Sequence, residues 1–215
     1  MAHGKPCATL FHCNNMKKQA LIFILFLLGM RLSAQDNMVI KSILVAGSEV
    51  NTIDADLYKR FEKNNTAQEH YGKLYFVKPY EFAAKFNTGK YMIVNEKRIK
   101  INIGLFYGNI RLKNGPLRSL SHIFLFAFQG RCEELAEENN YSIHVKTENN
   151  YHVVTFIKNK RTIGLTYKKV VFKFDIKDLR VKEIVLYDTN NTVDNYIISN
   201  VQYNVKVDSS NFDTN

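Results

Sequence analysis

The sequence predicts a mainly β (α+β) protein: one long, curved antiparallel sheet, with a helix at its start and a second helix inserted midway. Runs in which apolar and polar residues alternate recur along the chain, and turn residues such as Asn, Asp and Gly separate them. No segment has the strand–helix–strand rhythm that is typical of a parallel sheet. Hydrophobic residues make up 46% of the 215 residues, and Tyr and Phe, which favour strands, dominate the aromatic ones.

The chain begins with a segment that we expect to be a leader outside the folded domain. Two lysines follow Met16, an apolar run covers 20–30, and Ala34 closes the segment. A positive start, an apolar run too short to span a bilayer comfortably and a small final residue are typical of a secretory signal peptide. The alternative is an uncleaved membrane anchor.

These features predict where the mature chain begins. We expect translation to start at Met16, so that 1–15 are an upstream extension, and cleavage to fall near Ala34 and Gln35. Residues 1–34 are then the extension and signal peptide, and residues 35–215 form a single domain.

The composition excludes some classes of partner. The formal net charge is +10, but four of the basic residues lie in the leader, which leaves about +6 for the rest. The basic residues are scattered, so nucleic-acid binding is not expected, although the charge favours approach to an anionic membrane or an acidic partner. Cys132 is the one cysteine after the leader, so no disulfide is predicted.

The elements before the inserted helix begin with a helix and continue as strands. Apolar residues at helical spacing predict a helix over 38–47, which Gly47 ends. In the next run, Ala55, Leu57, Lys59 and Phe61 share one face of a strand, and two asparagines then mark a turn. The strands predicted in this half are 55–61, 74–78, 82–86, 91–94 and 99–103.

The strand over 74–78 is unusual because both of its faces are apolar or aromatic. Leu74 and Phe76 point one way, and Tyr75 and Val77 point the other. A strand with one solvated face does not have this pattern. Proline cannot donate to a strand ladder, so Pro79 ends this strand or sits at an edge.

The second half begins with a loop region, which includes Gly104 and Gly108, and then the inserted helix over 117–128. This helix is apolar almost all round and ends at Gly130. An acidic second helix or turn comes next, over 131–138. The strands predicted after it are 142–146, 152–157, 169–176, 182–187 and 197–207.

The sequence offers no positive reason to propose an enzyme. The histidines after the leader are not at metal-ligand spacing, and no nucleophile motif or phosphate-binding glycine loop is present. The glutamates over 133–138 are best interpreted as a solvated helix face. We therefore predict no catalytic residue, no metal and no cofactor. What stands out is surplus apolar surface, either a thick ordinary core or a pocket for an apolar ligand.

A set of collinear segments resembles the LolA-like family of outer-membrane lipoprotein carriers. The segment "GKLYFVKPYEFAAKF" is similar to the family pattern G-x-L-x-x-x-[KR]-P-x-x-F, followed by a strand with Ile93, Val94 and Asn95. The helix "LSHIFLF" is similar to the family's cap helix, and the run from Val170 to Phe212 to its closing strands. The resemblance covers essentially all of the mature chain.

The resemblance implies a half-open barrel whose mouth is covered by the N-terminal helix and the inserted helix. It further implies a monomeric periplasmic carrier that binds the acyl chains of lipoproteins and ferries them from the inner to the outer membrane. Its partners would be acylated lipoproteins, an inner-membrane lipoprotein-release transporter and an outer-membrane acceptor. The alternatives are a paralogue that carries another lipid or senses envelope state, and a structural or surface protein that binds nothing.

The same resemblance supplies the candidate ligand-binding residues. One face of 74–78 is expected to pack on the core and the other to line the lipid cavity, and Phe82→Glu is expected to abolish ligand uptake in a folded protein. Lys78 stands where the family often has Arg, which implies a weaker latch between barrel and lid. The chain stops three residues after Phe212, so a function tied to a longer tail is not implied. The predicted cavity and lid residues are Leu74, Phe76, Lys78, Pro79, Phe82, Phe86, Ile93, Ile99, Ile101, Leu120, Ile123 and Phe124.

Overall fold

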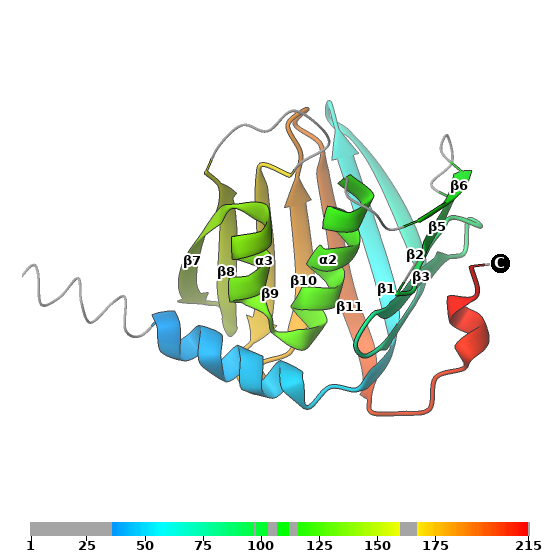
Figure 1. The fold of residues 1–215 in the computed structure, drawn as a ribbon. Coiled ribbons are helices and arrows are strands. Elements are labelled where there is room, and N and C mark those ends of the chain that lie inside the picture. Colours follow the sequence, from blue (N-terminus) through cyan, green and yellow to red (C-terminus); the bar gives the residue numbers. More distant parts are fainter. Residues whose placement is uncertain (1–35, 97, 103–106, 112–115, 160–166, 215) are drawn as a thin grey trace, which may run out of the picture. The chain divides into compact units, whose positions relative to one another are not determined.

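Eleven strands form one antiparallel sheet in a computed structural model of the chain (Figure 1). The structure describes residues 36–96, 98–102, 107–111, 116–159 and 167–214. The chain divides into two units, 1–38 and 39–215, and all eleven strands belong to the second. Only residues 36–38 of the first unit are described, so the predicted leader lies outside the described residues.

Each strand is hydrogen-bonded to its neighbours in the order β6-β5-β4-β3-β2-β1-β11-β10-β9-β8-β7. The sheet is therefore unclosed: β6 and β7 are its two edges, and β1 pairs with both β2 and β11 at its centre. The strands are β1 (Thr52–Lys63), β2 (Thr66–Val77), β3 (Glu81–Phe86), β4 (Tyr91–Val94), β5 (Arg98–Asn102), β6 (Tyr107–Arg111), β7 (Tyr141–Glu148), β8 (Tyr151–Lys158), β9 (Lys169–Asp175), β10 (Val181–Tyr187) and β11 (Val193–Tyr203).

The three longer helices lie against one face of this curved sheet, which confirms the half-open barrel architecture (Figure 1). The N-terminal helix ends at residue 48 (blue in Figure 1), and it is followed in the chain by α2 (Pro116–Gln129), α3 (Cys132–Asn139) and the short 3₁₀ helix η1 (Ser209–Phe212). Ile43, Phe124 and Leu135 bring the three longer helices into one core with the inner face of the sheet. Every residue from Ile123 to Gly130 is buried, as expected for a helix that is apolar almost all round.

Paired asparagines shape the two longest hairpins. Asn64 and Asn65 join β1 to β2 with φ angles of 50° and 63°, and Asn149 and Asn150 join β7 to β8 with 48° and 66°. Two consecutive residues with positive φ make the turn whose twist matches a pair of antiparallel strands. Asparagine tolerates this region better than other residues with a side chain, so each pair sets the register of its hairpin locally.

The two apolar faces of the strand over 74–78 pack in two different clusters. Leu74 and Phe76 are fully buried in the main core, but Tyr75 and Val77 belong to a separate cluster on the other face of the sheet. Phe212, from the C-terminal segment, packs into that cluster and is 4% exposed. The sequence does not decide which face of 74–78 lines a cavity. In the structure the C-terminal segment covers the face of Tyr75 and Val77, and the face of Leu74 and Phe76 is buried in the core.

Some predicted element bounds are also corrected. Gly108 lies within strand β6 and not in a loop. Strand β2 begins at Thr66, immediately after the hairpin turn, and β11 ends at Tyr203, so Val205 and Val207 lie beyond it. Just past β11, the backbone amide of Asn204 still donates to the carbonyl oxygen of Thr52, and Val207 then packs in the cluster of Phe212.

Candidate ligand-binding cavity

An open cavity of about 440 Å³ lies at the end of the sheet where the β1–β2 hairpin turns. Its walls come from β1 to β5, from α2, from β11 and from the turn between β10 and β11. Cavities of this size are within the range that holds small ligands. Its apolar lining includes Phe61, Phe86, Met92, Ile101, Leu120 and Tyr196.

The cavity arises from the period-two pattern of the strands. Along β1, Ile53, Ala55 and Leu57 face inward and are buried in the core. The next inward positions, Lys59 and Phe61, line the cavity. The core is thus filled along most of the inner face and becomes hollow toward the hairpin end.

An ion pair crosses one wall of the cavity. Lys59 Nζ lies 2.7 Å from Asp194 Oδ1 on the neighbouring strand β11, with both side chains less than a fifth exposed. The same ammonium lies 5.1 Å from the ring centre of Tyr196, a favourable cation–π distance. Burial raises the pKa of Tyr196, so its phenol is neutral. Within the wall, the carboxylate of Asp194 therefore neutralises the charge of Lys59.

A second polar pair lies beside the first, since His70 on β2 is the cross-strand partner of Lys59. Lys90 Nζ is 3.3 Å from His70 Nε2, and both residues line the cavity. Burial, and then the charges of Lys90 and Lys59, lower the pKa of His70. The imidazole is consequently neutral near pH 7, and its Nε2 accepts a hydrogen bond from the Lys90 ammonium.

Three of the predicted ligand-binding residues line this cavity: Phe86, Ile101 and Leu120. Six others are buried in the main core, and Ile93 belongs to the outer cluster with Phe212. Whether any of these residues contacts a ligand stays a prediction. The six core residues are Leu74, Phe76, Phe82, Ile99, Ile123 and Phe124.

An aromatic chain joins these core residues to the cavity. The rings of Phe82 and Phe124 stack, with centres 4.9 Å apart and an interplanar angle of 11°. Phe124 in turn meets the ring of Tyr196 edge-on, also at 4.9 Å. Since Tyr196 lines the cavity, the predicted phenylalanines form the packed layer directly behind its wall.

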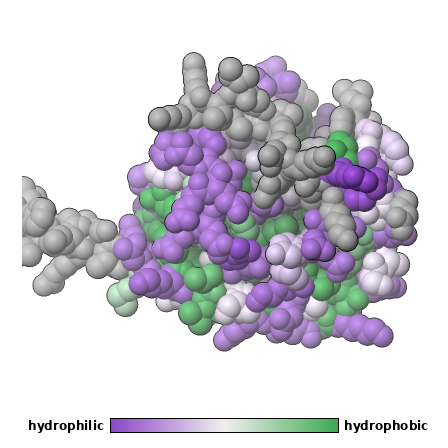
Figure 2. Space-filling view, viewed as in Figure 1, coloured by the Kyte–Doolittle hydropathy of each residue, from purple (hydrophilic) through white to green (hydrophobic). Residues whose placement is uncertain are grey.

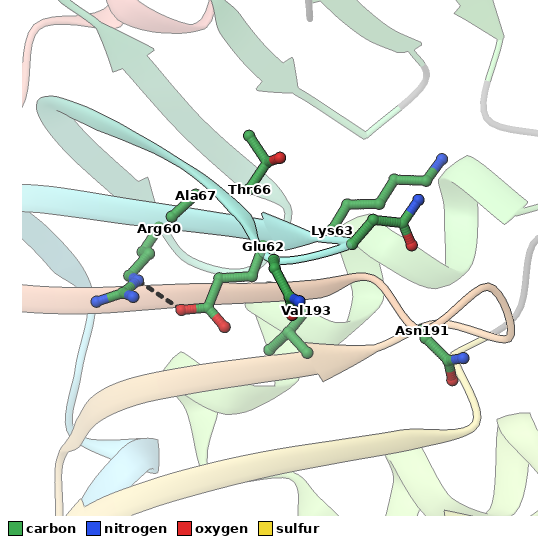
Figure 3. A pocket seen from close by; sticks show the side chains of 9 residues that line it. Arg60, Glu62, Lys63, Thr66, Ala67, Asn191 and Val193 are labelled. Atoms are coloured by element: carbon green, nitrogen blue, oxygen red, sulfur yellow. Dashed lines mark ion pairs between the residues drawn. The ribbon is translucent and has the colours of Figure 1, made fainter.

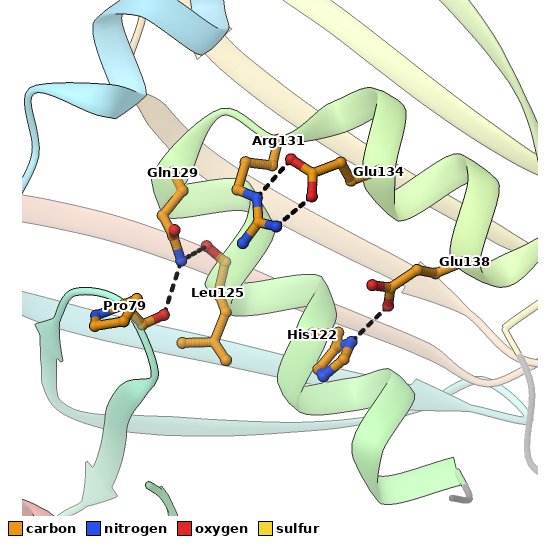
Figure 4. Close-up of polar contacts among 7 residues, drawn as sticks. All are labelled: Pro79, His122, Leu125, Gln129, Arg131, Glu134 and Glu138. Carbon is orange, nitrogen blue, oxygen red and sulfur yellow. Dashed lines mark hydrogen bonds and ion pairs between the residues drawn. The ribbon is translucent and has the colours of Figure 1, made fainter. Parts of the chain in front are cut away.

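The remaining predicted residues, Lys78 and Pro79, belong to a junction with the helices. Lys78 Nζ donates a hydrogen bond of 2.8 Å to the carbonyl oxygen of Ser48, the last residue of the N-terminal helix. Gln129 Nε2 donates one of 3.0 Å to the carbonyl oxygen of Pro79 (Figure 4). A cation at a helix C-terminus complements the helix dipole, so Lys78 connects the sheet to this helix.

Helices α2 and α3 are also joined by polar contacts (Figure 4). His122 Nδ1 lies 2.8 Å from Glu138 Oε2. Arg131, between the helices, makes a two-pronged contact with Glu134, which lowers the pKa of that carboxyl. The acidic face predicted for 131–138 is thus partly paired. Among the described residues no group of His, Cys, Asp and Glu suits a metal ion.

A second hollow, of about 480 Å³, lies around the tip of the β1–β2 hairpin (Figure 3). Its lining is mostly polar and includes the ion pair of Arg60 with Glu62, at 2.6 Å. Without an apolar wall it is a poor fit for hydrocarbon.

Figure 2 shows hydrophobic residues gathered in green patches, between hydrophilic purple ones, on the side where the helices lie. No helix within the described part of the chain has the length and apolar character needed to cross a membrane.

The charged residues of the cavity are absent from the sequence-based prediction. Lys59 shares an apolar strand face with Leu57 and Phe61, and that placement is the available signal. A lysine at an inward position needs an acidic partner or a route to solvent. His70 shares the face of Leu74 and Phe76 once β2 is extended back to Thr66, but the predicted strand begins at 74. Lys90 lies in the turn before β4, where the pattern does not indicate which way a side chain points.

Solved structures of other proteins are similar to this chain. A DUF1329 family protein from Desulfovibrio piger ATCC 29098 is 11% identical, with a TM-score of 0.46, over 85% of this chain and 97% of that one. A LolA superfamily protein from Nitrosomonas europaea is 10% identical, with a TM-score of 0.41, over 80% and 96%. The Mycobacterium tuberculosis lipoprotein LppX is 9% identical, with a TM-score of 0.35, over 80% and 97%.

No family model and no curated protein sequence matches the chain. The similar structures thus include a protein of the LolA superfamily, the family that the sequence resembles. At such low identity the similarity concerns the fold alone, and the candidate function rests on the cavity itself.

Proposed function

We propose that this protein is a carrier that binds acyl chains in the cavity between the sheet and α2, with acylated lipoproteins as its cargo. The observation that carries the proposal is the apolar, open hollow lined by Phe86, Ile101 and Leu120 on the inner face of the sheet.

The physical need for such a cavity comes from the low solubility of hydrocarbon. A chain of about fifteen methylenes costs roughly 12 kcal/mol to expose to water, at ~0.8 kcal/mol for each methylene. A cavity that shelters the chain offsets part of this cost. Hydrophobic burial has no preferred direction, so the cargo is released without breaking a specific bond.

The transport steps are part of the same proposal. The carrier would act in the periplasm as a monomer, after removal of the leader. It would receive lipoproteins from an inner-membrane release transporter and deliver them to an outer-membrane acceptor. The packed architecture needs no catalytic group for this role, and the proposal includes no enzymatic activity.

The proposal is tested by native mass spectrometry of the purified protein with an N-palmitoylated peptide. The wild-type protein is expected to form a one-to-one adduct. Phe86→Asp places a carboxylate in the half-buried cavity wall and is expected to abolish the adduct. Ile157→Asp is the matched control, because Ile157 is an exposed apolar strand residue that does not line the cavity.

Transport is tested separately in cells. Depletion of the protein is expected to leave lipoproteins in the inner membrane. Lipoproteins that reach the outer membrane normally after depletion would contradict the carrier role, even if the adduct forms in vitro.

The second candidate is a carrier of a different lipid on the same fold. One observation favours it: the cavity is not uniformly apolar, since Lys63, Lys90 and His70 also line it. A cavity for hydrocarbon alone has no use for these groups.

A further inference from the structure

The cavity holds more positive charge than its carboxylates neutralise. Lys59, Lys63 and Lys90 all line it, together with Asp188 and Asp194. Asp194 pairs with Lys59 at 2.7 Å. Asp188 instead accepts hydrogen bonds from the backbone amides of its own turn, at residues 190 and 192. Neither carboxylate is therefore assigned to Lys63 or Lys90.

No hidden carboxylate supplies the missing charge. Among the described residues, neither Lys63 nor Lys90 forms an ion pair with an Asp or Glu side chain. The segments between 36 and 214 that the structure does not describe are residue 97 and the ranges 103–106, 112–115 and 160–166, and their sequences contain no acidic residue. The excess positive charge is thus a property of the chain in this region.

The position of Lys90 differs from that of a solvated surface lysine. It is half-buried, and its ammonium lies 3.3 Å from the imidazole of His70 and not beside a carboxylate. With Nε2 as acceptor, the proton of the neutral imidazole is on Nδ1, which is buried without a partner in the described part of the chain. Lys63 lies on the same strand face as Lys59, nearer the hairpin turn, and is exposed. One half-buried and one exposed cation therefore flank the open end of an apolar hollow.

We propose that the cavity binds an acyl chain that carries an anionic group, with Lys90 and Lys63 holding the anion and the chain lying against Phe86, Met92 and Ile101. This inference rests on the acyl-chain binding of the proposed function and adds the chemistry of the headgroup. A carboxylate or phosphate provides acceptor oxygens for the lysine ammonium groups, and such charge-assisted hydrogen bonds strengthen where water is partly excluded. Lys59 takes no part, because Asp194 already neutralises it.

The test compares ligands of equal chain length that differ only at one end. Equilibrium dialysis of the full chain measures the affinities for dodecanoate, dodecyl phosphate and dodecanol at low ionic strength. We expect the better of the two anions to bind about tenfold more tightly than dodecanol. Tighter binding of dodecanoate indicates a fatty-acid type of headgroup, and tighter binding of dodecyl phosphate indicates a phospholipid type. The ratio of anion affinity to dodecanol affinity is expected to fall as salt is added.

Variants locate the anion site. Lys90→Met keeps most of the side-chain length and is expected to lose about tenfold in affinity for the anions, while dodecanol binding changes less than about twofold. Lys63→Met, at an exposed position that folding does not depend on, is expected to show a smaller loss of the same kind. Lys206→Met removes the same charge at an exposed site away from the cavity and is expected to change nothing.

Two results would overturn the inference. Equal affinity for dodecanol and both anions would show that the headgroup is not recognised. Equal losses in the Lys90→Met and Lys206→Met variants would show that only net charge matters. Failure of all three ligands to bind would instead contradict the acyl-chain cavity itself, and with it the proposed function.

Discussion

Gln129 on α2 donates a hydrogen bond to the carbonyl oxygen of Pro79, in the turn after β2, across 3.0 Å (Figure 4). Gln129 is 4% exposed, and the same amide nitrogen also donates to the carbonyl oxygen of Leu125 within its own helix. A buried amide therefore holds the C-terminal end of the inserted helix to the sheet.

Removing this amide has a predictable cost. Gln129→Met keeps the length and leaves the Pro79 carbonyl without its donor, so we expect the free energy of unfolding to fall by about 1–3 kcal/mol. Denaturant unfolding measures the change. Gln202→Met, at an exposed site on β11, is the control and is expected to change stability by less than about 0.5 kcal/mol. Equal effects of the two substitutions would contradict the structural role of Gln129.

Gly130 ends α2 with φ +68°, and a side chain there would meet the N-terminal helix. A Cβ atom at this position would lie 2.3 Å from the carbonyl oxygen of Ile43. Gly89 has a similar φ of +76° but open space around it. We expect Gly89→Ala to cost about 1–2 kcal/mol from backbone strain alone, and Gly130→Ala clearly more. Thermal unfolding of the two variants separates backbone strain from steric conflict. If the steric conflict at Gly130 is real, the melting temperature of Gly130→Ala is lower than that of Gly89→Ala.

Phe82 is fully buried and stacks on Phe124, so we expect it to be a core residue. Phe82→Ala is expected to cost about 3–5 kcal/mol, measured by denaturant unfolding. Phe82→Glu is expected to prevent folding, which reverses the sequence-based expectation of a folded protein without ligand uptake. A Phe82→Glu variant with native circular dichroism would contradict this assignment.

Substitution of Phe212 tests the packing of the outer cluster. Phe212→Ala is expected to destabilise the protein by about 3 kcal/mol, because the ring fills the outer cluster with Tyr75 and Val77. Binding of an acylated peptide should be unchanged at temperatures where the variant is folded, since Phe212, Tyr75 and Val77 do not line the cavity. Loss of binding in a folded variant would show that the two faces are coupled.

Cys132 provides a probe of unfolding. Burial raises the pKa of its thiol to about 12, and the side chain is 1% exposed. At pH 8 we expect it to react with a thiol reagent only after unfolding, in a chain whose Cys7 and Cys13 are replaced by serine. Because folding raises the pKa of this thiol, its contribution to the free energy of unfolding is full below its unfolded pKa, near 8.5. This contribution falls as the pH rises further. Rapid modification of the native protein would refute the burial.

The sequence indicates which residues share a face but not what covers that face. The alternation of Ile99 and Ile101 correctly predicts two buried residues on β5. The apolar partner of Tyr75 lies more than a hundred residues away, at Phe212, and no local pattern contains that contact. Gly108 indicates a loop because glycine is depleted in strands, but pairing with β5 outweighs this local preference.

The candidate site shows the same limit. Phe86, Ile101 and Leu120 line the cavity, and their strands and helix are amphipathic or wholly apolar. Whether an inner apolar residue ends in packed core or beside a hollow depends on how far the helices reach along the sheet. That distance is set by tertiary packing, as with the aromatic layer of Phe82 and Phe124.

The unclosed sheet has a mechanical consequence. No ladder of backbone hydrogen bonds joins β6 to β7 in the described strand order, so the two edges can move apart or together while every strand pair stays intact. A closed cylinder would have to shear its registers to admit a bulkier guest. The unclosed sheet can instead change its curvature while each strand keeps its register with its neighbours.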